Sequence, residues 1–218
     1  MPALDKIAVV GPGRLGTAIS AALREASLDV EGPLGRGRTP AAPVVLLTVP
    51  DGSIEPAAAA VPGGALVGHC SGASPLGRCD FSLHPLMTVP TAGARFSGIP
   101  AAVAGHPVAT RIAEALGMKP FHVADEDRAA YHAAACMASN FLVILEDAAE
   151  RVAQTAGIER ERLVPLVRAT VDNWARDGRA ALTGPIARGD VHTIERHRTA
   201  LRERAPDLLP LYEVMARC

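Results

Sequence analysis

The stretch KIAVVGPGRLGTAISAAL, residues 6–23, constrains the fold more than any other part of the chain, because it joins a short apolar strand to a helix through a loop with three glycines. In such a loop Gly11 permits a tight turn, and Gly16 lets the helix pack closely on the strand. Gly13 lets the backbone approach a pyrophosphate, which the unpaired N–H groups at the start of the helix then bind. The pattern predicts a dinucleotide-binding loop, and the alternative is a glycine-rich turn without a ligand. The predicted cofactor contacts here are Gly11, Pro12, Gly13, Arg14, Leu15 and Gly16.

The kind of dinucleotide depends on the residues that follow the second strand. An NAD-binding protein places Asp or Glu about 20 residues beyond the glycines, where the carboxylate holds the ribose hydroxyls. This chain has Arg36 at that place and Arg38 two residues later, and Glu31 comes too early. Guanidinium groups can pair with a 2′-phosphate through charge-assisted hydrogen bonds. The sequence therefore predicts NADP(H) as the cofactor, and the alternative is that both arginines belong to a solvated loop.

Up to residue 123, short apolar runs alternate with helical patterns. Runs such as VVLLTV lack polar alternation, which suits parallel strands covered on both faces. Alternating strands and helices predict a Rossmann domain, a doubly wound and mostly parallel α/β sheet, over residues 1–123. We expect strands at 6–10, 28–34, 43–49, 65–70, 81–84, 100–104 and 119–123, and helices at 15–26, 52–60 and 107–117.

After Asp125 the apolar spacing becomes helical and the segments become longer. These segments are separated by residues that end helices, namely Gly157, Gly178 and the pair Gly184-Pro185. We therefore expect an all-α domain over residues 124–218. The expected helices are 125–157, 160–177, 190–204 and 206–216, with Asp190 as a possible N-cap.

Two further segments follow predicted strands and would border the same crevice as the glycine loop. TVPDGSI follows the third strand and brings Val49 and Pro50 to the side where a nicotinamide ribose binds. HCSGA ends the fourth strand and brings Ser71 to the crevice, where it could hold a substrate. Both segments can also be explained as ordinary turns.

The segment YHAAACMASNFLVIL, residues 131–145, is almost wholly apolar, and its few polar groups recur at helical spacing. Extended backward to Asp125 and Arg128, they form a single polar face on the predicted long helix. Apolar packing does not account for that face. Its members are Asp125, Arg128, His132, Cys136, Ser139 and Asn140.

Composition argues against several classes of partner. A formal net charge of −1 gives no reason to expect nucleic acid or a membrane surface. The four cysteines are scattered without metal-ligand spacing, so reduced thiols are expected and no metal site is predicted. The chain begins without a signal-peptide pattern, and the apolar run 129–145 is shorter than the roughly 20 residues of a membrane span. We expect a soluble cytoplasmic protein.

The segments GPGRLG, LLTVPDGSI, GHCSGA, FSLHPLMTV and SNFL together resemble the 6-phosphogluconate dehydrogenase-like superfamily, which includes ketopantoate reductase, pyrroline-5-carboxylate reductase and prephenate dehydrogenase. HPLMTV, AAYHAAACMASNFLV and ALTGPIARGD are similar to a bacterial family of Rossmann-like proteins with a helical C-terminal domain of unknown function. The resemblance covers essentially the whole chain. It implies a homodimer that packs through the long helix 125–157, with the substrate bound between the domains.

Hydroxy-acid members of this superfamily carry K-x-x-x-N on the long helix, where the lysine donates a proton and the asparagine orients the substrate. In this chain Asn140 matches the asparagine, but Cys136 stands at the lysine position, and the two lysines of the chain lie elsewhere. This departure puts lysine-assisted hydride transfer in doubt. We predict that His132, two turns before Asn140, supplies the proton, since histidine is the usual acid or base near neutral pH. The alternative is that His132 is a buried core residue whose hydrogen bonds are satisfied and that has no catalytic role.

His84 is the second candidate for proton transfer, because HPL is similar to the histidine–proline pair of prephenate dehydrogenases. For substrate binding we predict Ser71 together with an arginine that holds a carboxylate. Arg128 lies on the polar face of the long helix, and Arg188 lies in LTGPIARGD, where turn chemistry does not explain it.

Taken together, these features predict an NADP(H)-dependent oxidoreductase that reduces a small carbonyl or imine acid. A ketopantoate-like 2-oxo acid is the first substrate expected, and a pyrroline-type imine is the second. A catalytically inert NADP-binding sensor or scaffold is the alternative from another class, and the missing lysine favours it.

Overall fold

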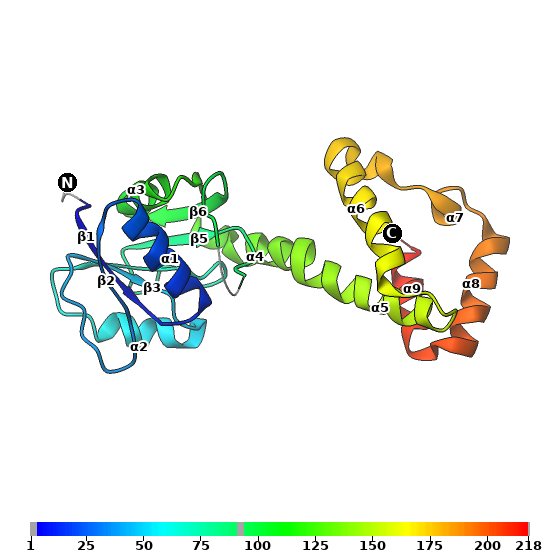
Figure 1. Ribbon diagram of the computed structural model, residues 1–218, viewed down its shortest axis with the longest axis horizontal. Helices are drawn as coiled ribbons and strands as arrows, with labels where there is room; N and C mark the ends of the chain where they lie inside the picture. The colour runs from blue at the N-terminus through cyan, green and yellow to red at the C-terminus, as the bar shows by residue number, and fades with distance from the viewer. Residues whose placement is uncertain (1–3, 91–93, 218) are drawn as a thin grey trace. The chain divides into compact units, whose positions relative to one another are not determined.

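The computed structural model describes residues 4–90 and 94–217 of the 218-residue chain. The chain forms two compact units, one ending at Ser139 and the other beginning at Asn140. The first unit contains the sheet, and the second is helical (Figure 1).

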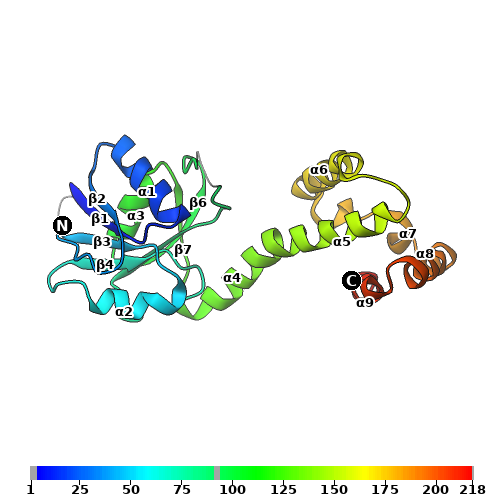
Figure 2. The same ribbon diagram turned by 60° about the horizontal axis from the view of Figure 1, so that its bottom comes forward.

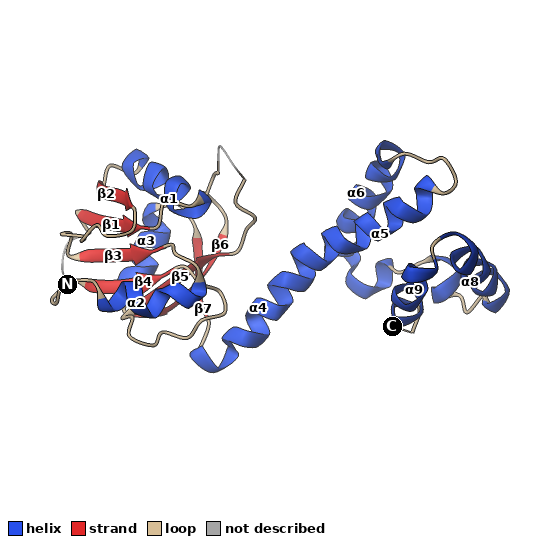
Figure 3. Cartoon of the chain, turned by 90° about the horizontal axis from the view of Figure 1, so that it is seen from below, coloured by secondary structure: helices blue, strands red, loops and turns tan. Residues whose placement is uncertain are grey.

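The first unit is built on a seven-stranded sheet with the order β2-β1-β3-β4-β5-β6-β7 (Figure 3, red). All neighbouring strands pair in parallel except β5 and β6, which are antiparallel. The carboxyl ends of β1 to β5 therefore lie along one edge of the sheet, which we call the carboxyl edge. The strands are β1 (Lys6–Val10), β2 (Asp29–Leu34), β3 (Val44–Leu47), β4 (Leu66–His69), β5 (Phe81–Pro85), β6 (Pro100–Gly105) and β7 (Lys119–His122).

Alternate side chains of the central strands enter two apolar cores on opposite faces of the sheet. Ile7 and Val9 of β1 pack in one core with α1 (Arg14–Glu25) and α3 (Val108–Ala115). Ala8, the residue between them, packs in the other core with Ile54 of α2 (Ile54–Ala59). Figure 2 shows α1 and α3 on one side of the sheet and α2 on the other. This three-layer arrangement confirms the predicted Rossmann class.

The remaining helices follow β7. A 3-10 turn over Asp125–Asp127 leads into α4 (Arg128–Cys136), a π turn (Met137–Phe141) and α5 (Leu142–Gln154). The other helices are α6 (Arg160–Asp177), α7 (Gly184–Ala187), α8 (Val191–Arg204) and α9 (Leu209–Met215). The Asp190 carboxylate caps α8, accepting a hydrogen bond from the backbone N–H of Thr193 at 3.0 Å.

All seven expected strands and the expected long helices are present, with ends shifted by a few residues. The change from strands to helices occurs near residue 124, where a domain boundary was expected. That boundary stays a prediction, because the two compact units divide fifteen residues later. The reason is that α4 contributes side chains to the sheet unit, as described below. Three short features were not predicted, namely the π turn at 137–141, the 3-10 turn at Gly178–Ala181 and helix α7.

The helical run Asp125–Gln154 is long and apolar enough to cross a membrane by length and composition, with a mean hydropathy of 1.2 over its most apolar window. One such helix is weak evidence for a membrane span, since apolar helices of soluble proteins share these properties. Several of its apolar side chains are exposed in the single chain. They are Met137 at 62%, Phe141 at 56%, Val143 at 68% and Ile144 at 60%.

Candidate functional site

The glycine loop lies at the carboxyl end of β1, at the point where the strand order reverses. There β2 pairs with one side of β1 and β3 with the other, and open α/β sheets bind ligands outside such a point. The backbone at Gly11 has φ +118°, and a Cβ there would come within 2.7 Å of the Thr48 carbonyl oxygen. A Cβ at Gly16 would overlap the carbonyl oxygen of Gly11. Both glycines are therefore required by close packing, as the sequence predicted.

Gly13 differs from the other two glycines of the loop. It is the N-cap of α1 and has φ −72°, which any residue can adopt, and a Cβ added to it would meet nothing within 4 Å. Packing within the chain does not explain this glycine, whereas a ligand that approaches the backbone would. The first turn of α1 contains no acidic residue, so its unpaired N–H groups are available to an anion.

Thr48 supports this loop, although no role was predicted for it. Its Oγ1 donates to the carbonyl oxygens of Val10 at 3.0 Å and Gly11 at 2.9 Å. Its backbone N–H also donates to Val10 at 2.7 Å, which fixes the end of β3 against the loop. The signal in the sequence was a hydroxyl directly after a buried strand. Val49, which follows it, is half-buried, and Pro50 is exposed at the start of the next turn.

Arg36 and Arg38 lie in the turn directly after β2, and both are exposed. Glu31 lies inside β2 opposite Ala8, and its Oε2 accepts a hydrogen bond from the Ala41 N–H at 3.0 Å. The carboxylate thus holds the segment after the turn and does not stand at the strand end. The residues present fit a dinucleotide with a 2′-phosphate better than one that needs a carboxylate for its ribose.

The HCSGA segment forms a tight turn at the carboxyl end of β4. The Ser71 Oγ accepts hydrogen bonds from the N–H groups of Ala73 at 3.2 Å and Ser74 at 2.9 Å. His69 is fully buried, its Nδ1 accepts from the Ser71 N–H, and its Nε2 lies 3.2 Å from the Pro75 carbonyl oxygen. Burial and the nearby Arg128 guanidinium lower the pKa of His69. His69 and Ser71 therefore shape this turn.

Arg128, at the start of α4, ties three elements of the sheet unit together. It is 1% exposed, and its guanidinium donates to Asp125 Oδ1 at 2.8 Å, to the Ser71 carbonyl oxygen and to the Ser82 hydroxyl. Although burial of Asp125 acts in the opposite direction, hydrogen bonds from the Leu76 N–H and from Arg128 lower the pKa of this carboxyl group. These internal contacts favour a supporting role for Arg128 over the predicted contact with a substrate.

Ser82 and His84 point to the same face of β5, because they are two residues apart on the strand. Arg128, Tyr131 and His132 lie on one face of α4 and pack against them. The Tyr131 hydroxyl lies 2.7 Å from His84 Nδ1, and the rings of His84 and His132 are 6.1 Å apart between centroids. The structure thus brings together His84 and His132, the two predicted proton donors.

Gly72 packs against both histidines. A Cβ on Gly72 would lie 2.8 Å from Cδ2 of His132 and 2.9 Å from Cε1 of His84. The turn after β4 therefore needs a glycine where it passes the two rings. We call Gly72, His84, Tyr131 and His132 the histidine cluster.

The two histidines of the cluster differ in their surroundings. Burial, together with the imidazole of His132 and the guanidinium of Arg128, lowers the pKa of His84 to about 4. His84 is therefore neutral near pH 7 and has no imidazolium proton to give. His132 is half-buried, and its Nδ1 lies 3.8 Å from the Cys136 thiol.

The cluster and the glycine loop share the carboxyl edge. The loop follows β1 and His84 is the next-to-last residue of β5, with β3 and β4 between the two strands. At about 4.8 Å per strand, the two features are roughly 14 Å apart across the sheet. One extended ligand could therefore reach from the loop towards the cluster.

Two predicted residues lie in the helical unit. Asn140 is in the π turn with an exposed side chain, and Arg188 is exposed at the end of α7. A π turn places one more residue in a turn than an α-helix does, so helical-wheel spacing from His132 does not fix the direction of Asn140. The roles of both residues stay predictions.

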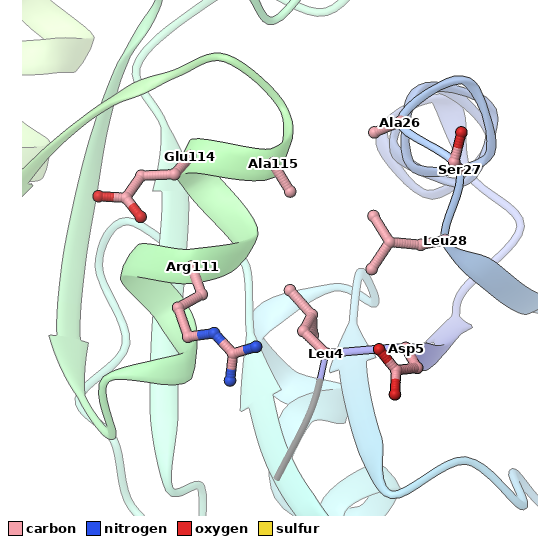
Figure 4. Close-up of a pocket in the computed structure, with 8 residues that line it drawn as sticks. All are labelled: Leu4, Asp5, Ala26, Ser27, Leu28, Arg111, Glu114 and Ala115. Atoms are coloured by element: carbon pink, nitrogen blue, oxygen red, sulfur yellow. The ribbon is translucent and has the colours of Figure 1, made fainter. Parts of the chain in front are cut away.

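A hollow of about 450 Å³ lies elsewhere on the sheet unit, between α3 and the amino-terminal segment (Figure 4). Leu4 and Asp5 precede β1, and Leu28 precedes β2, so the hollow is at the amino ends of these strands. None of the predicted site residues lines it.

The fold and the site define a protein with an N-terminal Rossmann domain and a helical C-terminal domain, the arrangement seen in solved structures of similar fold. A family model described as a domain of unknown function, DUF2520, matches residues 96–218. The chain belongs to this family. No curated protein sequence matches the chain significantly.

Solved structures share the fold over nearly the whole chain. The Bacteroides fragilis protein BF3122, named as a proposed NADP oxidoreductase, is 20% identical with a TM-score of 0.81 and covers 98% of this chain and 96% of its own. The Thermotoga maritima protein TM1727 is 25% identical with a TM-score of 0.77, over 97% and 95% of the two chains. A reductive aminase from Aspergillus terreus, solved with NADPH and ethyl levulinate, is 16% identical with a TM-score of 0.68, over 99% and 93%.

Proposed function

We propose that this protein is an NADP(H)-dependent oxidoreductase that reduces a small imine or carbonyl acid. The observation that carries the proposal is the glycine loop, in which a Cβ added to Gly13 at the uncapped helix start would meet none of the described residues within 4 Å. The exposed Arg36 and Arg38 after β2 support NADP(H) over NAD(H). The oxidoreductase names of proteins with the same fold support the class of reaction, and we place the chain in the 6-phosphogluconate dehydrogenase-like superfamily.

In this proposal the glycine loop and the N–H groups of Arg14 and Leu15 bind the pyrophosphate, and Val49 and Pro50 border the nicotinamide ribose. Bound NADPH would supply a hydride. The histidine cluster would bind the C=N or C=O group, and His132 would supply the proton, because the low pKa of His84 leaves that side chain neutral. Arg128 would hold the HCSGA turn and α4 in place for the cluster.

The substrate is proposed as a ketopantoate-like 2-oxo acid or a pyrroline-type imine. Proteins named as imine reductases and reductive aminases share the fold and support an imine, and a ketol-acid reductoisomerase with the same fold supports a carbonyl acid. Either acid needs a cation for its carboxylate. Arg128 is already fully engaged, so Arg188 is the remaining predicted arginine, with Asn140 as the predicted partner that orients the substrate.

The test is NADPH oxidation in the presence of cyclic imines and 2-oxo acids, followed by loss of NADPH absorbance. Turnover with a member of either class supports the reductase, and replacing His132 with Gln should then lower kcat far more than it lowers NADPH binding. NADPH binding without turnover of any member would support the alternative, an inert NADP-binding sensor or scaffold. The absence of a lysine from the long helix 125–157 favours this alternative.

We further propose a cytoplasmic homodimer that forms through the helical run after β7. The exposed apolar side chains from Met137 to Ile144 support this, since a soluble monomer seldom leaves so many large apolar groups open to water. Replacing Phe141 and Ile144 with Glu should convert a dimer to a monomer in light scattering. A wild-type monomer at working concentration would contradict the proposal.

A further inference from the structure

Tyr131 is the member of the histidine cluster to which neither the sequence nor the proposed reaction gives a role. Its hydroxyl lies 2.7 Å from His84 Nδ1, and the two rings meet edge to face, 5.6 Å apart at 85°. The Phe121 ring also packs edge to face against Tyr131, with 6.0 Å between centroids. These two ring contacts and the hydrogen bond hold the phenol against the imidazole.

The hydrogen bond between Tyr131 and His84 has a defined direction. Burial raises the pKa of Tyr131, so the phenol keeps its proton near pH 7 and needs an acceptor for it. Within residues 4–90 and 94–217, His84 Nδ1 is the one acceptor recorded for that hydroxyl. A neutral imidazole whose Nδ1 accepts carries its own proton on Nε2.

The Nε2 atom of His84 faces the rest of the cluster. A Cβ on Gly72 would lie 3.0 Å from this nitrogen, and the His132 ring lies on the same side of Gly72. Among the described residues, His84 Nε2 has no recorded hydrogen-bond partner. Besides Tyr131, the charged and titratable groups that act on His84 are Arg128 and His132 of α4, Asp51 after β3 and His69 at the end of β4.

We infer that Tyr131 is a positioning residue that fixes the proton of His84 on Nε2, so that His84 presents an N–H donor to the C=N or C=O group of the substrate. This inference rests on the proposed function. The N–H group draws electron density towards the substrate nitrogen or oxygen, and the neighbouring carbon accepts the hydride as NADPH is oxidised to NADP⁺. The proton that completes the new N–H or O–H bond comes from His132, which water then reprotonates. His84 keeps its proton throughout and acts as a fixed dipole.

The chain contains a second pair of the same kind, which provides a matched control. His197 Nδ1 and the Tyr212 hydroxyl are 3.0 Å apart in the helical unit, with their rings 5.9 Å apart at 84°. Tyr131→Phe and Tyr212→Phe each remove one hydroxyl from a histidine–tyrosine pair. Only the first should affect a reaction at the carboxyl edge.

The experiment combines ¹⁵N NMR of the histidine rings with steady-state kinetics. In the wild type, His84 should show the Nε2–H tautomer, and Tyr131→Phe should turn it into a mixture of tautomers. The same variant should lower kcat by at least about tenfold, with NADPH affinity within about twofold of the wild type. Tyr212→Phe should leave kcat, NADPH affinity and the His84 signals unchanged.

An Nδ1–H tautomer of His84 in the wild type, or a Tyr131→Phe variant with wild-type kcat, would overturn the inference. If the wild type shows the Nε2–H tautomer but oxidises no NADPH with any substrate, the proposed function fails while the positioning role of Tyr131 is supported. The NMR and kinetic measurements therefore separate the two claims.

Discussion

Replacing Gly13 with Ala tests whether the glycine loop is a ligand site or only a turn. The added Cβ meets nothing within 4 Å, and φ −72° suits alanine, so the folded chain accommodates it without strain. Ala as N-cap costs about 0.5–1 kcal/mol relative to Gly, and the smaller entropy of the unfolded chain offsets about 0.4–1 kcal/mol. The free energy of unfolding should therefore change by less than about 0.5 kcal/mol.

NADPH binding should respond very differently to the same change. The new methyl group would occupy the space above the helix start, where the pyrophosphate needs to approach the backbone N–H groups. Losing one charge-assisted hydrogen bond costs about 1.5–3 kcal/mol, which weakens NADPH binding by more than about tenfold. Titration of NADPH fluorescence measures the binding, and thermal unfolding measures the stability.

Gly63→Ala is the matched control for this experiment. Gly63 also has open space at its Cβ position and lacks a positive φ, but it precedes β4 at the opposite edge of the sheet. This variant should keep both stability and NADPH affinity. A Gly13→Ala protein that binds NADPH as tightly as the wild type would refute the assignment of the loop.

Three further changes follow from the same structure. Arg128→Ala should lower the free energy of unfolding, measured by urea denaturation, by about 2–4 kcal/mol, because Ser82 loses its buried partner. The control Arg176→Ala removes an exposed arginine and should cost less than about 0.5 kcal/mol. Equal effects of the two variants would contradict the supporting role of Arg128. The pKa of His84 is about 4 in the folded chain against 6.5 in the unfolded chain, so the free energy of unfolding should fall by about 2 kcal/mol between pH 7.5 and pH 4.5. His84→Asn should lose this part of the pH dependence. An unchanged pH profile in the variant would contradict the low pKa of His84. Gly72→Ala should abolish turnover while NADPH affinity stays near wild type, since the new methyl group displaces both imidazoles of the histidine cluster; wild-type kcat would show that the two rings need not stay in place.

The sequence predicted the scaffold well because the sheet unit follows local rules. The clearest strands, at 6–10 and 43–49, are short apolar runs with Gly or Pro beside them, and the glycine loop has one structural solution when it lies between a strand and a helix. The roles of Gly11 and Gly16 followed from that context. Helix α7 was missed because four residues around Gly184 and Pro185 also read as a turn.

The candidate site was predicted less completely, because a helical pattern gives a face of a helix but not its partner. The polar face of the long helix contained Arg128 and His132, yet nothing in the pattern showed that the guanidinium would be buried against Ser82. Tyr131 was read with the apolar residues, although it adjoins His132 and lies three residues after Arg128. The π turn around Asn140 could not be predicted, since it changes the helical spacing on which the prediction depended.

The most direct test of the account is calorimetric titration of the wild-type protein with NADPH and, separately, with NADH. We expect NADPH to bind at least about tenfold more tightly than NADH, because a guanidinium–phosphate pair adds a charge-assisted contact that NADH lacks. Arg36→Asp should remove that preference and leave NADH binding intact or improved. Equal affinity for the two cofactors in the wild type would contradict the assignment of NADP(H), and binding of neither would contradict the account as a whole.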